Sequence, residues 1–288
     1  MKYRCERCRL SVVRWLAASA ALLLAGCSRA KIERVEWPVM GTIAAVQCRA
    51  DSGARWPVVD VPFVEKVFSA VEKLMNAYDP DSELSRLAPL GEEEILANCN
   101  RGVRPCYEAA FNLARESGGA FNPRWKGPKT LDLGAIAKGY AVSLVTNDFA
   151  FVSQADMLVD LGGNVKSVRG TWKTGVRDPF SDGFAAVVEL REGEALATSA
   201  TYYRGSHIYD GRTGLAVSNG VASVTVLCSS AMWADGLSTT LFVLGPEEGK
   251  KFLDEKLKLL VGDMAVSALW IMNGGRQEIY GNARFQGN

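Results

Sequence analysis

His207 is the only histidine among the 288 residues of the chain. An unperturbed imidazole has a pKa of about 6.5, so it can exchange a proton near neutral pH and act as a general acid or base. Ser206 precedes it, and adjacent residues of a strand point to opposite faces, which argues against a Ser–His dyad. One histidine also excludes a metal site built from several imidazoles. A structural role for His207, in a turn or a half-buried slot, stays open.

A second candidate site lies in residues 131–140, where a short apolar strand runs through glycine into a helix. Backbone N–H groups at such a helix start can hold a phosphate, and Lys138, one turn into the helix, adds positive charge. The spacing matches neither G-x-G-x-x-G nor the Walker A pattern, so it predicts neither a Rossmann fold nor a P-loop. A strand-to-helix turn with a solvated lysine is the alternative.

A third candidate lies in residues 234–240. Asp235 and Thr239 are four residues apart, so on a helix they share one face. A carboxylate combined with hydroxyl or carbonyl oxygens suits a hard cation such as Mg²⁺, which keeps part of its water shell. The alternative is that Asp235 caps the N-terminus of the helix that follows.

The first 26 residues have the composition of a secretory signal. A basic start is followed by an apolar run from Trp15 to Leu24 and then by Leu24-Ala25-Gly26-Cys27. The run is shorter than the roughly 20 apolar residues of a membrane span. The last four residues resemble a bacterial lipobox, which predicts that the mature chain begins at a lipidated Cys27. An ordinary signal peptide or an uncleaved anchor is the alternative.

Charge and length limit the functions of the mature chain. The signal contains five of the 33 basic residues and one of the 32 acidic residues, so the remaining 262 residues have a net charge near −3. This balance argues against a nucleic-acid partner, and the length fits one large domain. Four further cysteines, Cys48, Cys99, Cys106 and Cys228, are either buried thiols or partly disulfide-bonded in an exported protein.

The hydrophobic spacing predicts helices first and mainly antiparallel strands after them, which indicates an α+β fold. Residues 28–36 are expected to form a tether between the lipid and the domain. We expect helices over 63–78, 105–116, 136–152, 232–244 and 247–257. We expect strands over 39–48, 156–161, 164–169, 172–177, 184–190, 221–228, 264–272 and 277–280.

Short motifs follow one another between Val39 and Gly245. They are Met40-Gly41-Thr42, Tyr78 to Ser85, Gly119 to Pro123, Leu131 to Tyr140, Leu161 to Asn164, His207 to Gly214, and Ser223 to Val226 continuing to Asp235. Together they resemble the ApbE family, flavin transferases that move FMN from FAD onto a protein threonine or serine. The resemblance implies a single ApbE-like domain over 37–288, an antiparallel sheet packed with helices and similar to the T-fold.

The resemblance also implies roles for individual residues. The positions that align with FAD-holding residues are Met40, Tyr78, Ala120, Phe121, Asn122, Asp132, Lys138 and Tyr209. The positions that align with the metal site, for Mg²⁺ or another divalent cation, are Ala135 through its backbone oxygen, Asp235, Ser238 and Thr239. His207 would take the proton of the attacking acceptor hydroxyl while AMP leaves.

The implied acceptors are exported or membrane flavoproteins, such as subunits of the Na⁺-translocating NADH:quinone reductase or of related electron-transport complexes. The chain itself would be an exported lipoprotein that faces the periplasm from the inner or the outer membrane. Two other functions stay open on the same residues. One is a metal-dependent FAD pyrophosphatase, in which water replaces the acceptor hydroxyl, and the other is a non-catalytic FAD-binding lipoprotein.

The chain departs from the family pattern at several places. Only seven residues, 124–130, stand where members usually carry a much longer segment, and we expect this to alter the flavin pocket and acceptor recognition. The substituted positions are Asn122 for a usual Asp, Ala200 for a common Gly, Gly211 for a frequent Pro and Ser238 for the Asp of some members.

Overall fold

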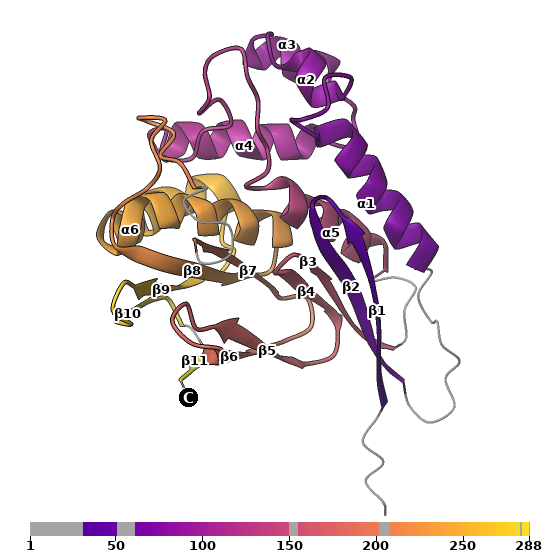
Figure 1. Ribbon diagram of the computed structural model, residues 1–288, viewed down its shortest axis with the longest axis vertical. Helices are drawn as coiled ribbons and strands as arrows, with labels where there is room; N and C mark the ends of the chain where they lie inside the picture. The colour runs from indigo at the N-terminus through magenta and orange to yellow at the C-terminus, as the bar shows by residue number, and fades with distance from the viewer. Residues whose placement is uncertain (1–30, 51–60, 150–154, 202–207, 283, 288) are drawn as a thin grey trace, which may run out of the picture.

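Strand β8 (Val221–Cys228) runs through the core, and all eight of its residues are buried. A computed structural model describes residues 31–50, 61–149, 155–201, 208–282 and 284–287. In it β8 belongs to an eight-stranded antiparallel sheet of order β1-β2-β3-β4-β7-β8-β9-β10 (Figure 1). The other strands are β1 (Lys31–Val39), β2 (Thr42–Ala50), β3 (Asp156–Leu161), β4 (Asn164–Arg169), β7 (Ala195–Ala200), β9 (Ser267–Met272) and β10 (Gln277–Tyr280).

A smaller sheet covers the opposite face from the helices, as Figure 1 shows. It has the order β11-β6-β5, from β5 (Trp172–Arg177), β6 (Phe184–Leu190) and β11 (Phe285–Gln286). Val188 of this sheet packs in one apolar cluster with Leu196, Leu227 and Leu269 of the large sheet. Burial on both faces explains why β8 and β9, which are buried at every position, are mostly apolar.

Helices cover the other face of the large sheet. They are α1 (Val61–Met75), α2 (Glu83–Leu87), α3 (Glu92–Asn98), α4 (Arg104–Glu116), α5 (Ala137–Phe149) and α6 (Ala231–Val261). Helix α1 buries Val64, Phe68, Val71 and Met75, which recur at helical spacing. None of the described helices is both long enough and apolar enough to cross a membrane.

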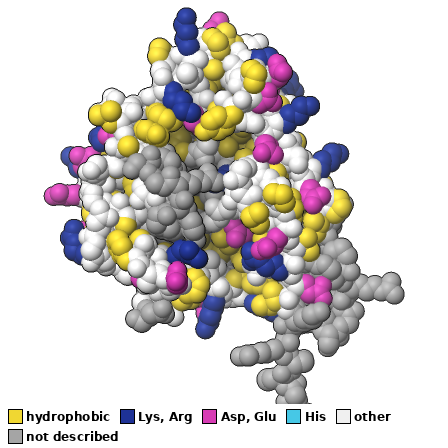
Figure 2. Space-filling model, viewed as in Figure 1, with side chains coloured by type: hydrophobic (Ala, Val, Ile, Leu, Met, Phe, Trp, Pro, Cys, Tyr) yellow, Lys and Arg dark blue, Asp and Glu magenta, His cyan; other side chains and the backbone are white. Residues whose placement is uncertain are grey.

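This α+β architecture confirms the expected fold class, and several of the predicted elements match the structure closely. The four strands from β3 to β6 have the predicted bounds, and the predicted break in α6 is present at Gly245, whose φ is +73°, just before Pro246. Side chains of both charge signs are interspersed over the face shown in Figure 2.

The predictions were wrong at the N-terminal edge of the sheet. The single strand expected over 39–48 is a hairpin, in which Val39 pairs with Thr42 around a turn at Met40 and Gly41. Both turn residues have positive φ, +51° and +65°. Residues 31–36 of the expected tether belong to β1, because their backbone groups pair with β2. Strand β7 was not predicted.

The four cysteines of the described domain are all unpaired and buried. Burial raises the pKa of both Cys48 and Cys228 to about 12, so these thiols stay protonated at neutral pH. A protonated, buried thiol is a poor nucleophile and a poor metal ligand. The structure therefore favours buried thiols over the disulfide alternative.

Helix α5 meets α6 at Gly139 with no space for a side chain. A Cβ atom there would lie 2.2 Å from the Ala231 carbonyl oxygen and 2.6 Å from the Asp235 Cβ. Only glycine permits this approach, and its backbone N–H then reaches Asp235 of the neighbouring helix. Gly139 therefore sets the spacing of the two helices that contain the predicted phosphate and cation motifs.

We predict that Gly139→Ala lowers the free energy of unfolding by at least about 2 kcal/mol, because overpacking between two backbones cannot be relieved by a rotamer change. Urea unfolding followed by circular dichroism measures this change. Gly183→Ala is the control, since its Cβ would meet only the Ser181 hydroxyl at 3.5 Å. Equal stability of the two variants would contradict the assigned close contact.

Candidate functional site

Asp235 is the buried anion of the candidate site, with 5% of its surface exposed. Its Oδ2 accepts the Gly139 N–H at 2.9 Å and lies 3.8 Å from the Lys138 Nζ. Burial raises the pKa of Asp235, while Lys138, the Gly139 N–H and the Asn164 side chain act against that rise. Ser230 caps α6 and accepts the Trp233 N–H, so the alternative role of Asp235 as the cap is wrong.

The Gly139–Asp235 hydrogen bond changes the start of α5. In a regular helix the Gly139 N–H would bind the carbonyl of Ala135, four residues earlier. Here it binds a side chain of α6, and no other hydrogen bond to the Ala135 carbonyl is found among the described residues. The backbone oxygen predicted as a cation ligand is therefore unused within the fold.

The two predicted hydroxyl ligands differ in their surroundings. Ser238 is fully buried, and its Oγ donates to the Asp235 carbonyl at 2.9 Å. Thr239 is half-buried, and its Oγ1 lies 3.0 Å from the Ser199 Oγ. Thr239 is therefore the hydroxyl of the pair that is open to a ligand.

The predicted ligand atoms fit a divalent cation of the Mg²⁺ type. They comprise one carboxylate, one hydroxyl and one backbone carbonyl, all hard oxygen ligands, on Asp235, Thr239 and Ala135. Among the described residues no group of three or more His, Cys, Asp or Glu side chains is placed to hold a metal. A cation at this site would therefore depend on few protein ligands and keep waters or substrate oxygens, which is the usual behaviour of Mg²⁺.

An aromatic and cationic cluster brings together three of the predicted FAD-holding residues. The Lys126 Nζ lies 3.0 Å from Asp132 Oδ2 and 5.3 Å from the ring centroid of Tyr78. The ring of Tyr209 stacks on that of Trp125, with centroids 4.0 Å apart and planes at 12°. Tyr78 is 87% exposed, so its ring is open to a planar ligand.

Trp125 and Lys126 were missed by the sequence analysis, which considered only the length of segment 124–130. The Lys126 Nζ lies 4.8 Å from the Trp125 ring centroid, so an indole and a cation are presented together. The signal that would have found them is the pairing of Trp and Lys directly between two of the FAD motifs. Arg124 holds the segment in place through hydrogen bonds to the carbonyls of Ala88 and Leu90 at 2.8 and 2.6 Å.

The remaining predicted FAD-holding residues lie in three different places. Met40 lies in the turn between β1 and β2, while Ala120 and Phe121 are 1% and 3% exposed within the helix-side core. Asn122 contacts the turn after Tyr209, because its Nδ2 donates to the Gly211 carbonyl at 3.1 Å. His207 and Cys27 lie outside the described residues.

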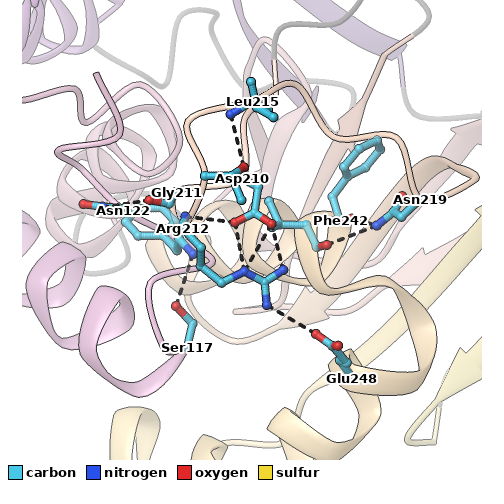
Figure 3. A network of polar contacts seen from close by, with 12 residues as sticks. Ser117, Asn122, Asp210, Gly211, Arg212, Leu215, Asn219, Phe242 and Glu248 are labelled. Atoms are coloured by element: carbon cyan, nitrogen blue, oxygen red, sulfur yellow. Dashed lines mark hydrogen bonds and ion pairs between the residues drawn. The ribbon is translucent and has the colours of Figure 1, made fainter. Parts of the chain in front are cut away.

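A network of polar contacts holds that turn, as Figure 3 shows. The Asp210 carboxylate accepts hydrogen bonds from the backbone N–H, Nε and Nη2 of Arg212, including Nε to Oδ1 at 2.9 Å and Nη2 to Oδ2 at 2.8 Å. The Arg212 guanidinium also lies 3.5 Å from Glu248. The backbone of Gly211 donates to the Ala120 carbonyl at 3.1 Å. A Cβ at position 211 would lie 2.2 Å from the Asn122 Cβ, so the turn docks tightly on residues 119–122.

The chain matches a known protein family over most of its length. The family model described as "ApbE family" matches residues 40–128 and 124–261, well over half of the chain. The chain belongs to the ApbE family. This confirms the resemblance drawn from the motifs.

Individual relatives agree with the ApbE assignment. A Klebsiella pneumoniae protein named "FAD:protein FMN transferase" is 38% identical over 41% of this chain, but the match covers only 40% of its own length. The match to a Rhodobacter capsulatus protein of the same name covers 25% of that protein. A Vibrio cholerae protein, also of that name, is 28% identical over 82% of this chain and 89% of its own.

Solved ApbE structures show the same fold. The flavin transferase ApbE from Vibrio cholerae superposes with a TM-score of 0.68 at 23% identity, over 87% of this chain and 97% of that one. The apo flavinyl transferase ApbE from Pseudomonas stutzeri gives 0.68 at 24% identity, over 87% and 96%. The expected ApbE-like architecture, an antiparallel sheet packed with helices, is thereby confirmed.

We predict that Asn122→Asp lowers the free energy of unfolding by about 1–3 kcal/mol, because a carboxylate cannot donate to the Gly211 carbonyl and repels it. The change keeps an oxygen for the Arg124 N–H, so the loss is specific to the Nδ2 donor. Urea unfolding measures it. Asn98→Asp is the matched control, since it removes an exposed bond from Nδ2 to the Glu94 carbonyl. If Asn98→Asp lowers the free energy of unfolding as much as Asn122→Asp does, the role of Asn122 in holding the turn at Gly211 is refuted.

The Asp210–Arg212 pair gives a pH-dependent prediction. The hydrogen bonds from Arg212 lower the pKa of Asp210 below its ordinary value of 3.8. A carboxyl whose pKa is lowered by folding stabilises the protein above its unfolded pKa, and this contribution is lost as the pH falls through the folded pKa.

Arg212→Met should therefore cost about 0.5–1 kcal/mol at pH 7, a value discounted because the arginine is partly exposed. The cost should shrink as the pH falls below 3.8 and then through the lower pKa of the folded Asp210, where its carboxylate becomes protonated. Thermal melting from pH 3 to pH 7 measures this, with Arg101→Met as the exposed-arginine control. If the stability lost in Arg212→Met does not change with pH, the loss comes from packing of the arginine side chain and not from its charge.

Proposed function

We propose that this ApbE-family chain transfers FMN from FAD to a threonine or serine hydroxyl of another protein, with a divalent cation such as Mg²⁺, and releases AMP. The observation that carries the proposal is the buried Asp235 beside Lys138, Thr239 and an unused Ala135 carbonyl. The names of the relatives support the activity, and the hard oxygen ligands support the choice of cation.

The cationic and aromatic groups suit the diphosphate and the planar rings of FAD. The diphosphate is anionic, and Lys138 in the first turn of α5 supplies positive charge on that side. Planar rings bind well against exposed aromatic faces, which Tyr78 and the Trp125–Tyr209 stack offer. Lys126 lies between these rings and Asp132, so it can also compensate charge on the substrate.

The reaction requires a proton acceptor and a stabilised leaving group. The acceptor hydroxyl oxygen forms a new bond to the phosphorus of the FMN half, the bond from that phosphorus to the bridging oxygen breaks, and AMP leaves with the bridging oxygen. In this proposal His207 removes the hydroxyl proton. A bound divalent cation would neutralise charge on the diphosphate and polarise the phosphorus.

The mature chain is proposed to work at a membrane surface. The signal-like residues 1–26 and the lipobox-like segment ending at Cys27 support an exported lipoprotein that faces the periplasm. The proposed acceptors are exported or membrane flavoproteins, including subunits of the Na⁺-translocating NADH:quinone reductase or related electron-transport complexes. This location would place the enzyme beside such acceptors.

We predict FMN transfer by the full-length chain in detergent, given FAD, Mg²⁺ and a domain with an Asp-Gly-x-Thr-Gly-Ala-Thr-like acceptor sequence. Intact-protein mass spectrometry should show one FMN on the acceptor. Asp235→Asn should slow transfer at least about 100-fold, and His207→Ala by about 100-fold or more. The exposed Asp263→Asn is the control and should keep its activity.

Other outcomes of this experiment discriminate between the alternatives. Release of AMP and FMN without an adduct would replace the transferase with a pyrophosphatase. Bound FAD with neither product would leave a non-catalytic flavin-binding protein. Full activity of Asp235→Asn would contradict the cation site.

A further inference from the structure

Ser199 lies on β7 beneath the candidate cation site. It is the fifth residue of the strand, on the same face as Ala195 and Ala197, which belong to the helix-side core. Its Oγ lies 2.8 Å from the Ser238 Oγ and 3.0 Å from the Thr239 Oγ1 on α6. A single hydroxyl of the sheet therefore contacts both predicted hydroxyl ligands.

The directions of the hydrogen bonds among Ser199, Ser238 and Thr239 follow from the single proton that each hydroxyl can donate. A carbonyl only accepts, so Ser238 must donate its one proton to the Asp235 carbonyl. Ser238 can then only accept from Ser199, which uses the one proton of Ser199. Thr239 must therefore donate to Ser199.

These proton directions leave the Thr239 oxygen available to a cation. A hydroxyl that binds a cation presents an oxygen lone pair and needs its proton directed elsewhere. Ser199 accepts that proton, so the Thr239 oxygen has its lone pairs free for the solvent-accessible side of the half-buried residue. The same bond fixes the χ1 rotamer of Thr239 relative to Asp235, one helical turn away.

We propose that Ser199 is a positioning residue, which fixes the rotamer and proton direction of Thr239 so that its oxygen and the Asp235 carboxylate bind a divalent cation together. The inference rests on the proposed function, because it assigns a hydrogen-bond partner to one ligand of the proposed cation site. Hydrogen-bond partners of metal ligands typically change metal affinity about 10–100-fold when removed. Ser199 should therefore affect cation binding more than FAD binding.

The test uses Ser199→Thr and Ser199→Val, which have nearly the same shape but differ in the hydroxyl. The probe is Mn²⁺ alone, titrated into the full-length chain, with free Mn²⁺ measured by electron paramagnetic resonance. We expect Ser199→Val to weaken Mn²⁺ binding at least about tenfold and Ser199→Thr to stay within about twofold of the wild type. Ser199→Ala replaces Ser199→Val if the latter does not fold.

Two controls separate positioning from general damage. Thr198→Val removes the neighbouring hydroxyl on the other face of β7, which bonds Thr225 at 2.8 Å, and it should leave Mn²⁺ affinity unchanged. In a Thr239→Val background, Ser199→Val should add no further loss, because Ser199 acts only through Thr239. The Mg²⁺ concentration for half-maximal transfer should rise in Ser199→Val with little change in the KM for FAD.

The possible failures are distinguishable. If the wild type binds Mn²⁺, Asp235→Asn abolishes this binding and Ser199→Val binds as tightly as the wild type, the positioning role is refuted while the cation site stands. An additional loss in the Thr239→Val background would also refute it, since Ser199 would then act by another route. If the wild type neither binds Mn²⁺ nor shows Mg²⁺-dependent transfer, the cation site and the role of Ser199 fail together.

Discussion

The contact between α5 and α6 at Gly139 is the constraint on which the candidate site depends. Because position 139 has no side chain, the two backbones approach until an N–H of α5 can bind a carboxylate of α6. That bond and Lys138 help to keep a negative charge at Asp235 despite its burial, which by itself favours the neutral acid. It also leaves the Ala135 carbonyl without its helical partner. One steric requirement thus brings the Asp235 carboxylate to the start of α5 and leaves the Ala135 carbonyl unpaired among the described residues.

The sheet beneath the helices completes this arrangement. Strands β7 and β8 lie against α6 and are covered by the small sheet on their other face, so their side chains cannot shift without disturbing two apolar clusters. Ser199 follows the buried residues 195–197 of β7 and is itself half-buried, and its hydroxyl contacts Ser238 and Thr239 of α6. These two contacts, from a strand whose preceding residues are packed in the core, are what make Ser199 suitable for orienting a hydroxyl on α6.

The sequence predicted elements well wherever local patterns were strong, and failed where pairing across distance determined the structure. Strands β3 to β6 are separated by turn residues, and their bounds were predicted correctly. Strand β1 contains the charged residues Glu33, Arg34 and Glu36, so its composition resembled a linker, but the hairpin with β2 orders it. Asp235 and Lys138 could be predicted because each lies in a short contiguous motif whose residue types indicate its chemistry. The roles of Ser199 and Trp125 depend on residues distant in sequence, which periodicity cannot show.

The segment 124–130 is held in place by a single arginine. Arg124 anchors it to carbonyls of the loop after α2, and this lets Trp125 stack on Tyr209 while Lys126 extends towards Tyr78 and Asp132. Two departures from the family pattern, Asn122 and Gly211, contact each other in the same region: the amide donor of one binds the carbonyl of the other. A proline ring at 211 would remove the N–H that bonds Ala120 and would occupy the space of Asn122. Asn122 therefore links the turn at Gly211 to the segment 124–130, because its Nδ2 donates to the Gly211 carbonyl and its Oδ1 accepts the Arg124 N–H.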